Sequence, residues 1–304
     1  MISALKKSIA TGILLAGSVG VAMAADALKP FVLAYTTGGD IEQVAGDVKD
    51  KLSTAGFEIA GSYSPYEGAL ILAITNDTLK QAAASSEFGG YAAGQRVTLT
   101  KVEDEIQVSY TNPLYYGTAY RLKETEGLNQ VASALQTALG KTDTFGTGEK
   151  QLSDNDLRKY RYMFGMERFN NPSELASYKS YDEAIAAVEQ GLNTGAGGAS
   201  KVYRIDIPGK QETVFGVALT DGCSGDEYIM SRIDRDNLRS TGHLPYEILV
   251  SGGDVYALYA RFRIAISWPH LPMIASETGA TFFNIMCAPN AIEESLIKAA
   301  GGRV

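Results

Sequence analysis

Hydrophobic residues in the first part of the chain follow two spacings, one typical of helices and one typical of strands. After Asp40, which can cap a helix, apolar residues recur three or four positions apart at Ile41, Val44, Val48 and Leu52. Short runs rich in β-branched and aromatic residues predict strands at Phe31–Thr36, Phe57–Tyr63 and Ala69–Thr75. A second helix is predicted to begin at a cap formed by Asn76 or Asp77.

A hairpin completes this series. Gly94–Tyr110 has the pattern of two strands joined by a turn at Glu103–Glu105. The order strand, helix, two strands, helix, two strands favours a mixed or antiparallel sheet with helices on one face. Beyond the hairpin, Thr111–Leu122 holds an Asn-Pro break and an aromatic cluster, Leu128–Leu139 has the pattern of an amphipathic helix, and Gly140–Lys150 that of a linker.

A second hairpin, Gly242–Ser267, is similar to the first and indicates a duplicated domain. Its strands are predicted at Tyr246–Val250 and Val255–Ile266, around a turn whose two glycines can adopt positive φ. When the two turns are aligned, Asp104–Tyr110 stands beside Gly253–Tyr259.

The stretch that precedes this second hairpin contains similar patterns. A helix capped by Ser180 or Asp182, two paired strands and another helix are predicted at Tyr181–Leu192, Lys201–Ile207, Thr213–Leu219 and Asp226–Asp234. Less regular stretches predict part of a strand at Leu157–Phe169, the start of a short helix at Ser173–Ala176, and a strand, a break and a helix over Thr281–Ala300. We predict that the last of these is the counterpart of Tyr162–Ala176.

These patterns predict an α+β fold of two tandem repeats, each a mixed or antiparallel sheet backed by helices. The predicted boundaries are a signal peptide at residues 1–24, a first repeat at 25–150 and a second repeat at 151–304. Hydrophobic residues make up 45% of the chain, which is enough to fill two cores.

Within the first repeat, Leu70–Leu99 resembles the core of the domain-of-unknown-function family 302. That family has a strand, a small turn containing Asn, an alanine-rich helix, a loop and then an edge hairpin. The turn here is Ala73–Asp77, without the Cys and Pro found in many members, and Ala93–Gln95 replaces the Leu-Pro-Cys that often starts the hairpin. The resemblance covers Phe31–Leu122 and implies a fold, but no reaction.

The first residues have the pattern of a secretory signal. Lys6 and Lys7 precede an apolar stretch at Ser8–Val21, and Ala22–Ala24 forms an A-x-A cleavage motif. We predict cleavage after Ala24, or after the next alanine, and a periplasmic or secreted protein. An uncleaved N-terminal anchor is the alternative, and no lipoprotein cysteine follows the site.

The charge balance bears on the class of partner. The chain has 27 basic and 35 acidic residues, a net charge of −8, and loss of Lys6 and Lys7 with the signal makes it −10. An acidic chain without a basic stripe repels phosphate backbones, so we expect no nucleic-acid partner. No second apolar run has the length of a membrane span, so none is expected after signal cleavage.

Two cysteines and two histidines offer a limited choice of chemistry. Cys223 and Cys287 can form one disulfide in an oxidising compartment, or can be two separate buried thiols. Cys223 with His243 could form a nucleophile pair, although no oxyanion motif or orienting partner accompanies them. His243 and His270 are predicted as polar loop residues. No metal site and no cofactor are expected, because no ligand spacing is present.

A ligand site is predicted where the two repeats meet. In a regular strand Tyr259, Arg261 and Arg263 would share one face, which is either a solvated sheet surface or a groove for a planar or anionic ligand. The candidate ligand-binding residues lie near this junction and are Tyr110, Asn112, Tyr116, His243, Tyr246, Tyr259 and Arg261.

The predicted function is non-catalytic binding of an unknown small molecule or protein at the cleft between the repeats. Two alternatives remain open at this stage. One is a small thiol- or histidine-dependent enzyme that uses Cys223 or His243. The other is an assembly subunit that pairs with other chains through exposed sheet edges.

Overall fold

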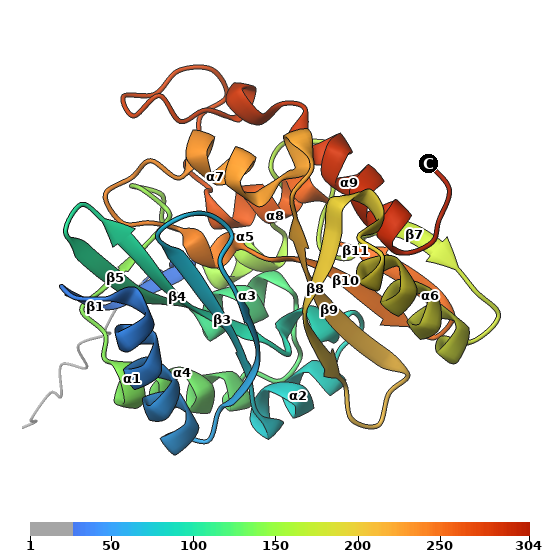
Figure 1. Ribbon diagram of the computed structural model, residues 1–304, viewed down its shortest axis with the longest axis horizontal. Helices are drawn as coiled ribbons and strands as arrows, with labels where there is room; N and C mark the ends of the chain where they lie inside the picture. The colour runs from blue at the N-terminus through green and yellow to red at the C-terminus, as the bar shows by residue number, and fades with distance from the viewer. Residues whose placement is uncertain (1–26) are drawn as a thin grey trace, which may run out of the picture.

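Two antiparallel sheets covered by helices make up the part of the protein that the computed structural model describes, residues 27–304 (Figure 1). The strand order is β2-β3-β4-β5-β1-β6 in the first sheet and β7-β11-β10-β9-β8 in the second. This confirms the predicted α+β fold, with antiparallel rather than mixed pairing. The predicted signal peptide, residues 1–24, lies outside the described residues.

The strands of the first sheet are β1 (Phe31–Thr37), β2 (Glu58–Tyr63), β3 (Ala69–Thr75), β4 (Gln95–Val102), β5 (Glu105–Thr111) and β6 (Asp143–Phe145). Those of the second are β7 (Ser173–Ser177), β8 (Ala199–Asp206), β9 (Glu212–Leu219), β10 (Tyr246–Ser251) and β11 (Asp254–Ala257). The helices are α1 (Ile41–Thr54), α2 (Asp77–Ala84), α3 (Pro113–Ala119), α4 (Glu126–Leu139), α5 (Asp154–Arg158), α6 (Tyr181–Asn193), α7 (Asp226–Ile233), α8 (Ala260–Ser267) and α9 (Ala288–Ala299).

Both sheets are built with the same connections. The chain runs β1-α1-β2-β3-α2-β4-β5-α3 in the first half and β7-α6-β8-β9-α7-β10-β11-α8 in the second. The shared strands then lie in the same order, β2-β3-β4-β5-β1 and β8-β9-β10-β11-β7. This matching connectivity is what a duplicated domain requires, while the duplication itself stays a prediction.

Side-chain caps start the helices where the polar residues predict them. Asp40 accepts hydrogen bonds from the amides of Glu42 and Gln43 at the start of α1. Of the alternative caps, Asn76 accepts from the amide of Leu79, and Ser180 from the amide of Glu183. These bonds satisfy amides that the first turn of a helix leaves without a partner.

The two hairpins have turns of equal length. In the first, Val102 pairs with Glu105, and in the second Ser251 pairs with Asp254. Each turn has a residue with positive φ, Glu103 in the first hairpin and Gly252 in the second. The β4–β5 hairpin lies between β3 and β1, inside the sheet, and not at the edge that the family resemblance implies.

The predicted strand Val255–Ile266 is wrong. The strand β11 ends at Ala257, and α8 begins three residues later. Nearly every residue of α8 is buried, so the helix has no polar face to produce an amphipathic spacing in the sequence. The argument that placed Tyr259, Arg261 and Arg263 on one strand face is therefore wrong as well.

Three other local predictions also differ from the structure. Leu157–Phe169 holds the end of α5 and irregular backbone where part of a strand was expected, and Ser173–Ala176 belongs to strand β7 and not to a helix. Phe282–Ile285 is a turn of 3-10 helix in place of the strand predicted there. In its packing, α9 matches α4 and not the predicted counterpart Tyr162–Ala176: α4 packs on α1 and α3, and α9 packs on α6 and α8.

The two halves pack closely against each other. Figure 1 shows the blue-to-green half beside the yellow-to-red half, with α1 and α4 outside one and α6 and α9 outside the other. Thr241–His243 of the second half contacts β3, β4 and β5, while Gly89–Ala92 of the first half contacts β9 and β10. Where β2 meets β8, a Cβ atom on Gly61 would lie 2.1 Å from the carbonyl oxygen of Val202.

Candidate functional site

The predicted ligand residues fall in three separate places, and one of these is the closed interior between the sheets. The hydroxyl of Tyr116 lies 3.3 Å from that of Ser267, which lies 2.9 Å from Nδ1 of His243. The other ring nitrogen of His243 lies 2.9 Å from the hydroxyl of Tyr246. Tyr116, His243 and Tyr246 are at most 2% exposed. This chain of hydrogen bonds is sealed from solvent.

The surroundings of His243 disfavour the protonated form of its imidazole. Burial lowers the pKa of His243 well below its usual value, and the positive charges of Arg263 and Arg96 lower it further. His243 is therefore a buried residue and not the polar loop residue predicted. His270 does lie in a loop, where its Nε2 is 2.9 Å from a carboxylate oxygen of Asp236.

Tyr110 and Asn112 line a second place, a polar pocket of about 530 Å³ beside α4. Their polar groups already have partners within the fold. The hydroxyl of Tyr110 donates to the carbonyl of Gly140, and the side-chain amide of Asn112 donates to the carbonyl of Lys29. The Oδ1 atom of Asn112 accepts from the amide of Leu114 and so caps α3. Both residues have structural roles here.

Tyr259 lines the third place, a pocket of about 600 Å³ where the two halves meet. The first half contributes Arg121, just after α3, and the segment that leads into β7 contributes the remaining lining, Gly165–Arg168 and Asn170–Pro172. Arg261, in the first turn of α8, contacts the pocket residue Glu167. The Nε atom of Arg261 lies 3.2 Å from Oε2 of Glu167. Tyr259 and Arg261 are thus the predicted residues that the structure brings together at an open site.

Arg121 has an unusual backbone conformation, with φ of 55°. The amide of Arg121 donates to the carbonyl of Thr118 at 3.0 Å, and the amide of Leu122 donates to that of Gly117 at 2.9 Å. This pair of bonds is the Schellman ending of a helix, and its left-handed position is normally glycine. A side chain there costs about 1 kcal/mol. The chain tolerates that strain while placing a guanidinium at the pocket wall.

The electrostatics of the pocket are dominated by two arginines, Arg121 and Arg168, which have no carboxylate partner in the described part of the chain. Burial lowers the pKa of Arg121, and the nearby positive charge of Arg168 lowers it further. Within residues 27–304 neither guanidinium forms a salt bridge, and Nε of Arg121 is buried without a hydrogen-bond partner. The carboxylate of Glu167, which also lines the pocket, is engaged by Arg261. The site is chemically suited to an anion.

Arg121 and Arg168 were not among the ligand-binding residues predicted from the sequence. A usable signal was present at Tyr120–Leu122, where a helix ends without the glycine or asparagine that such endings favour. The nearness of Arg168 has no signal in the sequence, because 46 intervening residues separate the two arginines and the segment around Arg168 is irregular.

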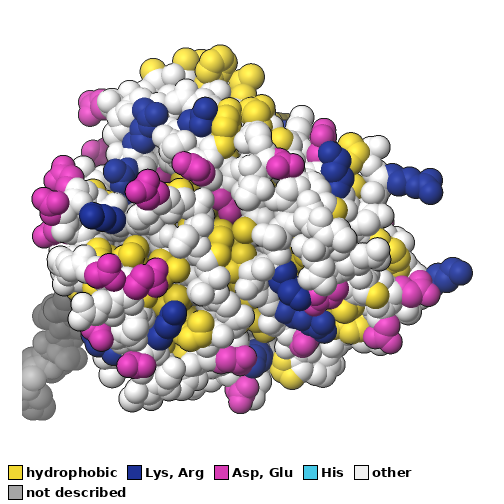
Figure 2. All heavy atoms as spheres, viewed as in Figure 1, with side chains coloured by type: hydrophobic (Ala, Val, Ile, Leu, Met, Phe, Trp, Pro, Cys, Tyr) yellow, Lys and Arg dark blue, Asp and Glu magenta, His cyan; other side chains and the backbone are white. Residues whose placement is uncertain are grey.

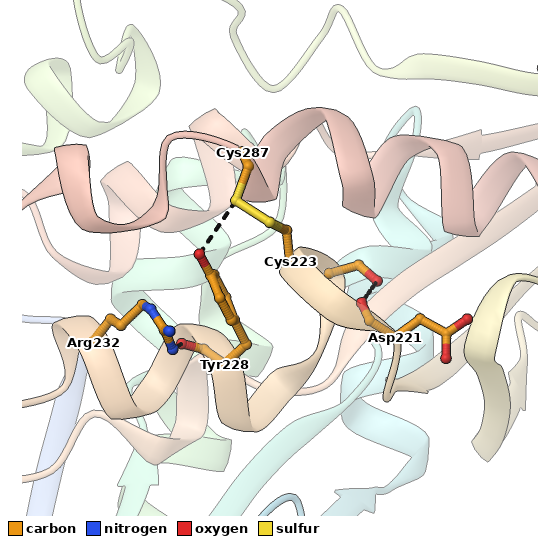
Figure 3. Close-up of a disulfide and its surroundings, with 6 residues drawn as sticks. Asp221, Cys223, Tyr228, Arg232 and Cys287 are labelled. Atoms are coloured by element: carbon orange, nitrogen blue, oxygen red, sulfur yellow. Dashed lines mark hydrogen bonds between the residues drawn. A yellow bond between two sulfur atoms is a disulfide. The ribbon is translucent and has the colours of Figure 1, made fainter.

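The cysteines form a disulfide, one of the two alternatives left open by the sequence. Cys223, before α7, is bonded to Cys287, before α9, with the Cα atoms 5.9 Å apart. Figure 3 shows the hydroxyl of Tyr228 pointing at Cys287, 3.3 Å from its sulfur, with the guanidinium of Arg232 beside the same ring. The disulfide ties the start of α9 to the segment that leads into α7.

The proposed Cys223–His243 nucleophile pair is wrong for this structure. Cys223 is bonded to Cys287, and both ring nitrogens of His243 lie within hydrogen-bond distance of Ser267 and Tyr246. Among residues 27–304 there is also no group of three or more His, Cys, Asp or Glu side chains placed to hold a metal ion.

From residue 27 onward, no helix is both long enough and apolar enough to cross a membrane. No family model, no curated protein and no solved structure matches the chain.

Proposed function

We propose that this protein is exported and binds a small anion, such as a phosphate or a carboxylate, in the pocket between Arg121 and Tyr259. We name this the arginine pocket; it is lined by Arg121, Gly165, Met166, Glu167, Arg168, Asn170, Asn171, Pro172 and Tyr259. The observation that carries the proposal is that Arg121 and Arg168 line the same pocket, while among residues 27–304 neither guanidinium has a carboxylate partner.

An anion would neutralise these two positive charges, which no carboxylate among residues 27–304 does. Guanidinium groups present parallel N–H donors that match carboxylate and phosphate oxygens, and such charge-assisted bonds are stronger than neutral ones. Asn170, Asn171 and Tyr259 add neutral polar groups at the same pocket. Because Glu167 is held by Arg261, its carboxylate does not neutralise Arg121 or Arg168.

The strain at Arg121 supports the same proposal. Strained backbone conformations persist mainly where the surroundings hold them and are common at functional sites. A side chain at this position is unfavourable for the helix ending, and we infer that binding by the Arg121 guanidinium offsets this cost. The role proposed is binding without catalysis, since no nucleophile or general base lies among the lining residues apart from the paired Glu167.

Export and duplication belong to the proposal too. The signal at residues 1–24 would deliver the chain to a compartment in which the Cys223–Cys287 disulfide persists. The repeats would occupy 25–150 and 151–304, with the arginine pocket at their junction, and the resemblance to the domain-of-unknown-function family 302 stays a prediction for the first of them.

The experiment that tests the pocket is a calorimetric titration of the mature protein with inorganic phosphate and with succinate. We expect saturable binding that Arg121→Gln and Arg168→Gln each weaken by tenfold or more, since a charge-assisted hydrogen bond contributes about 1.5–3 kcal/mol. The matched control is Lys141→Gln, which removes one positive charge from the polar pocket beside Tyr110. Binding weakened by Lys141→Gln and not by the arginine variants would move the site to that other pocket.

A further inference from the structure

The exposed large hydrophobic side chains are concentrated in two segments. Within the described chain, all of them except Val304 lie at Met163–Phe164 or between Met273 and Met286. Phe164 is 91% exposed and Ile274 is 79% exposed. Figure 2 shows hydrophobic side chains gathered at the top of the molecule, over the loop that leads from α8 to α9. A contiguous patch of exposed hydrophobic side chains is typical of an interaction surface.

The two segments form one surface, which we call the apolar crest: Met163, Phe164, Met273, Ile274, Phe283 and Met286. Tyr162, next to Met163, stacks on the ring of Phe282 with the centroids 5.8 Å apart, and its hydroxyl contacts the sulfur of Met273. Two hydrogen bonds close the base of the second loop, from the amide of Phe282 to Pro272 and from that of Phe283 to Met273. These contacts hold the two segments of the crest in place.

The crest adjoins the arginine pocket. The amide of Met166 donates to the carbonyl of Met163 at 3.1 Å, so Phe164 and Gly165 form the tip of a tight turn. Gly165 and Met166 line the arginine pocket, and Phe164, which precedes them in the chain, is not one of its lining residues. One turn thus carries both an exposed aromatic ring and part of the wall of an anion site.

The charge around this turn is opposite to that of the chain as a whole. The segment that begins with Arg158 and ends with Arg168 contains four basic residues, those two included, and one acidic residue, Glu167, which pairs with Arg261. The guanidinium carbon of Arg161 lies 4.9 Å from the centre of the Phe164 ring. From Leu271 to Met286 the only charged residue is Glu277. The net charge of the whole chain is −8.

We propose that the crest and the arginine pocket together bind the surface of an anionic lipid bilayer. Phe164 and Ile274 would enter the boundary between headgroups and acyl chains, and Arg121 and Arg168 would hold the phosphate of one headgroup. This inference rests on the proposed anion-binding function and names the source of the anion. Exposed aromatic and aliphatic side chains beside basic residues are the combination that holds peripheral proteins at such surfaces.

The charge pattern favours a lipid surface over a second copy of the chain. In a two-fold dimer whose axis passes through the basic turn, that turn would face its own equivalent, and like charges facing each other oppose association. An anionic bilayer instead supplies both an apolar layer for Phe164 and many phosphates for the neighbouring arginines.

The test measures how much of the mature protein sediments with vesicles of phosphatidylcholine, with and without phosphatidylglycerol. We expect sedimentation only when phosphatidylglycerol is present. Phe164→Ser and Ile274→Ser should each weaken it about tenfold, because each removes one large apolar side chain from the buried layer. The matched control is Val304→Ser, which removes an exposed apolar side chain outside the crest and should change nothing.

Titration of the same variants with inorganic phosphate separates this inference from the proposed function. Phe164→Ser and Ile274→Ser should bind phosphate as the parent protein does, while Arg121→Gln and Arg168→Gln should lose phosphate and vesicles together. Phosphate binding without any vesicle binding would overturn the lipid inference and leave the anion pocket intact. Full vesicle binding by the arginine variants would overturn the assignment of the headgroup site.

A measurement of native mass tests whether a second copy covers the crest. If the parent protein does not bind vesicles and its native mass falls from that of a dimer to that of a monomer on Phe164→Ser, the lipid inference is wrong and a second copy covers the crest.

Discussion

Arg96 on strand β4 and Glu247 on strand β10 form an ion pair between the two sheets, with Nη2 of the arginine 2.6 Å from Oε1 of the glutamate. Both side chains are 2% exposed. The other carboxylate oxygen of Glu247 lies 2.9 Å from Nη1 of Arg263, and the hydroxyl of Tyr203 donates to Oε1 at 2.6 Å. A single carboxylate therefore holds groups from both halves of the molecule.

Replacement of Glu247 by Gln should destabilise the protein by about 3–5 kcal/mol, since breaking a buried pair leaves uncompensated charge inside. Here two guanidiniums, those of Arg96 and Arg263, lose their shared partner. Urea unfolding followed by circular dichroism measures the change. The control is Glu189→Gln at a partly exposed pair with Lys201, which should change stability by less than about 1 kcal/mol. A Glu247→Gln protein as stable as the control would show that the ion pair is dispensable.

The sequence predicted most of the elements whose faces differ in polarity. Helix α1 has a polar outer face and a named cap at Asp40, and the β4–β5 hairpin has a short polar turn, so both were placed correctly. Helix α8 is buried almost all round, and its sequence alternates enough to resemble a strand. Strand β7 has five residues and lies at the sheet edge, and so gives too short a pattern to separate it from a helix start.

The candidate site could be predicted only in part. Tyr259 and Arg261 lie at or next to the arginine pocket, but the reason given for them, a shared strand face, was wrong. Tyr116, His243 and Tyr246 contain the groups that ligand sites often use, yet they are buried between the sheets. Whether a polar side chain faces solvent or a neighbouring domain depends on how the halves pack, and a single sequence does not record this packing.

Arg121→Gly should make the protein more stable and less able to bind an anion. Glycine relieves the left-handed strain at φ of 55° and should stabilise the fold by about 1 kcal/mol. The same change removes one of the two guanidiniums of the arginine pocket. Thermal unfolding with and without phosphate measures both effects. A protein that is more stable and still gains the parental amount of stability from phosphate would contradict the role given to Arg121.

Because of the Asp226 carboxyl group, we expect the free energy of unfolding to decrease as the pH rises from about 4 to about 7. Burial raises the pKa of Asp226 to about 7, although hydrogen bonds from the amide of Leu219 and the hydroxyl of Tyr63 oppose the rise. An unfolded aspartate has a pKa near 3.9. Between these two values the folded protein holds a proton that the unfolded chain has released, so each pH unit lowers the free energy of unfolding by up to about 1.4 kcal/mol.

The variant Asp226→Asn isolates this effect, because asparagine carries no titrating proton and can still accept from Tyr63. Its free energy of unfolding, minus that of the parent protein, should increase between pH 4 and pH 7. Asp234 has a pKa raised by burial to about 7 as well, so Asp234→Asn should behave in the same way. Stability differences that stay constant with pH would mean that both carboxyl groups are ionised in the folded protein.

Loss of the disulfide should lower stability without preventing folding. Cys223 and Cys287 are 64 residues apart, and in the chain-entropy view closing a loop of that length stabilises a protein by about 4 kcal/mol. A protein with both cysteines replaced by serine should therefore unfold at lower urea concentration. The fully reduced parent protein should match it, and a double-serine protein as stable as the oxidised parent would contradict the role given to the disulfide.

Gly61→Ala tests whether the two halves are held in close contact where β2 meets β8. The added Cβ atom would lie 2.1 Å from the carbonyl oxygen of Val202, which is backbone and has little freedom to move. Overpacking of this kind typically destabilises by about 1–3 kcal/mol. The matched control is Gly46→Ala in α1, where nothing lies within 4 Å of the new atom. There the better helix propensity of alanine should stabilise by up to about 1 kcal/mol. Destabilisation by Gly61→Ala together with stabilisation by Gly46→Ala would establish the contact. Stabilisation by both variants would mean that the two halves are free to separate where β2 meets β8.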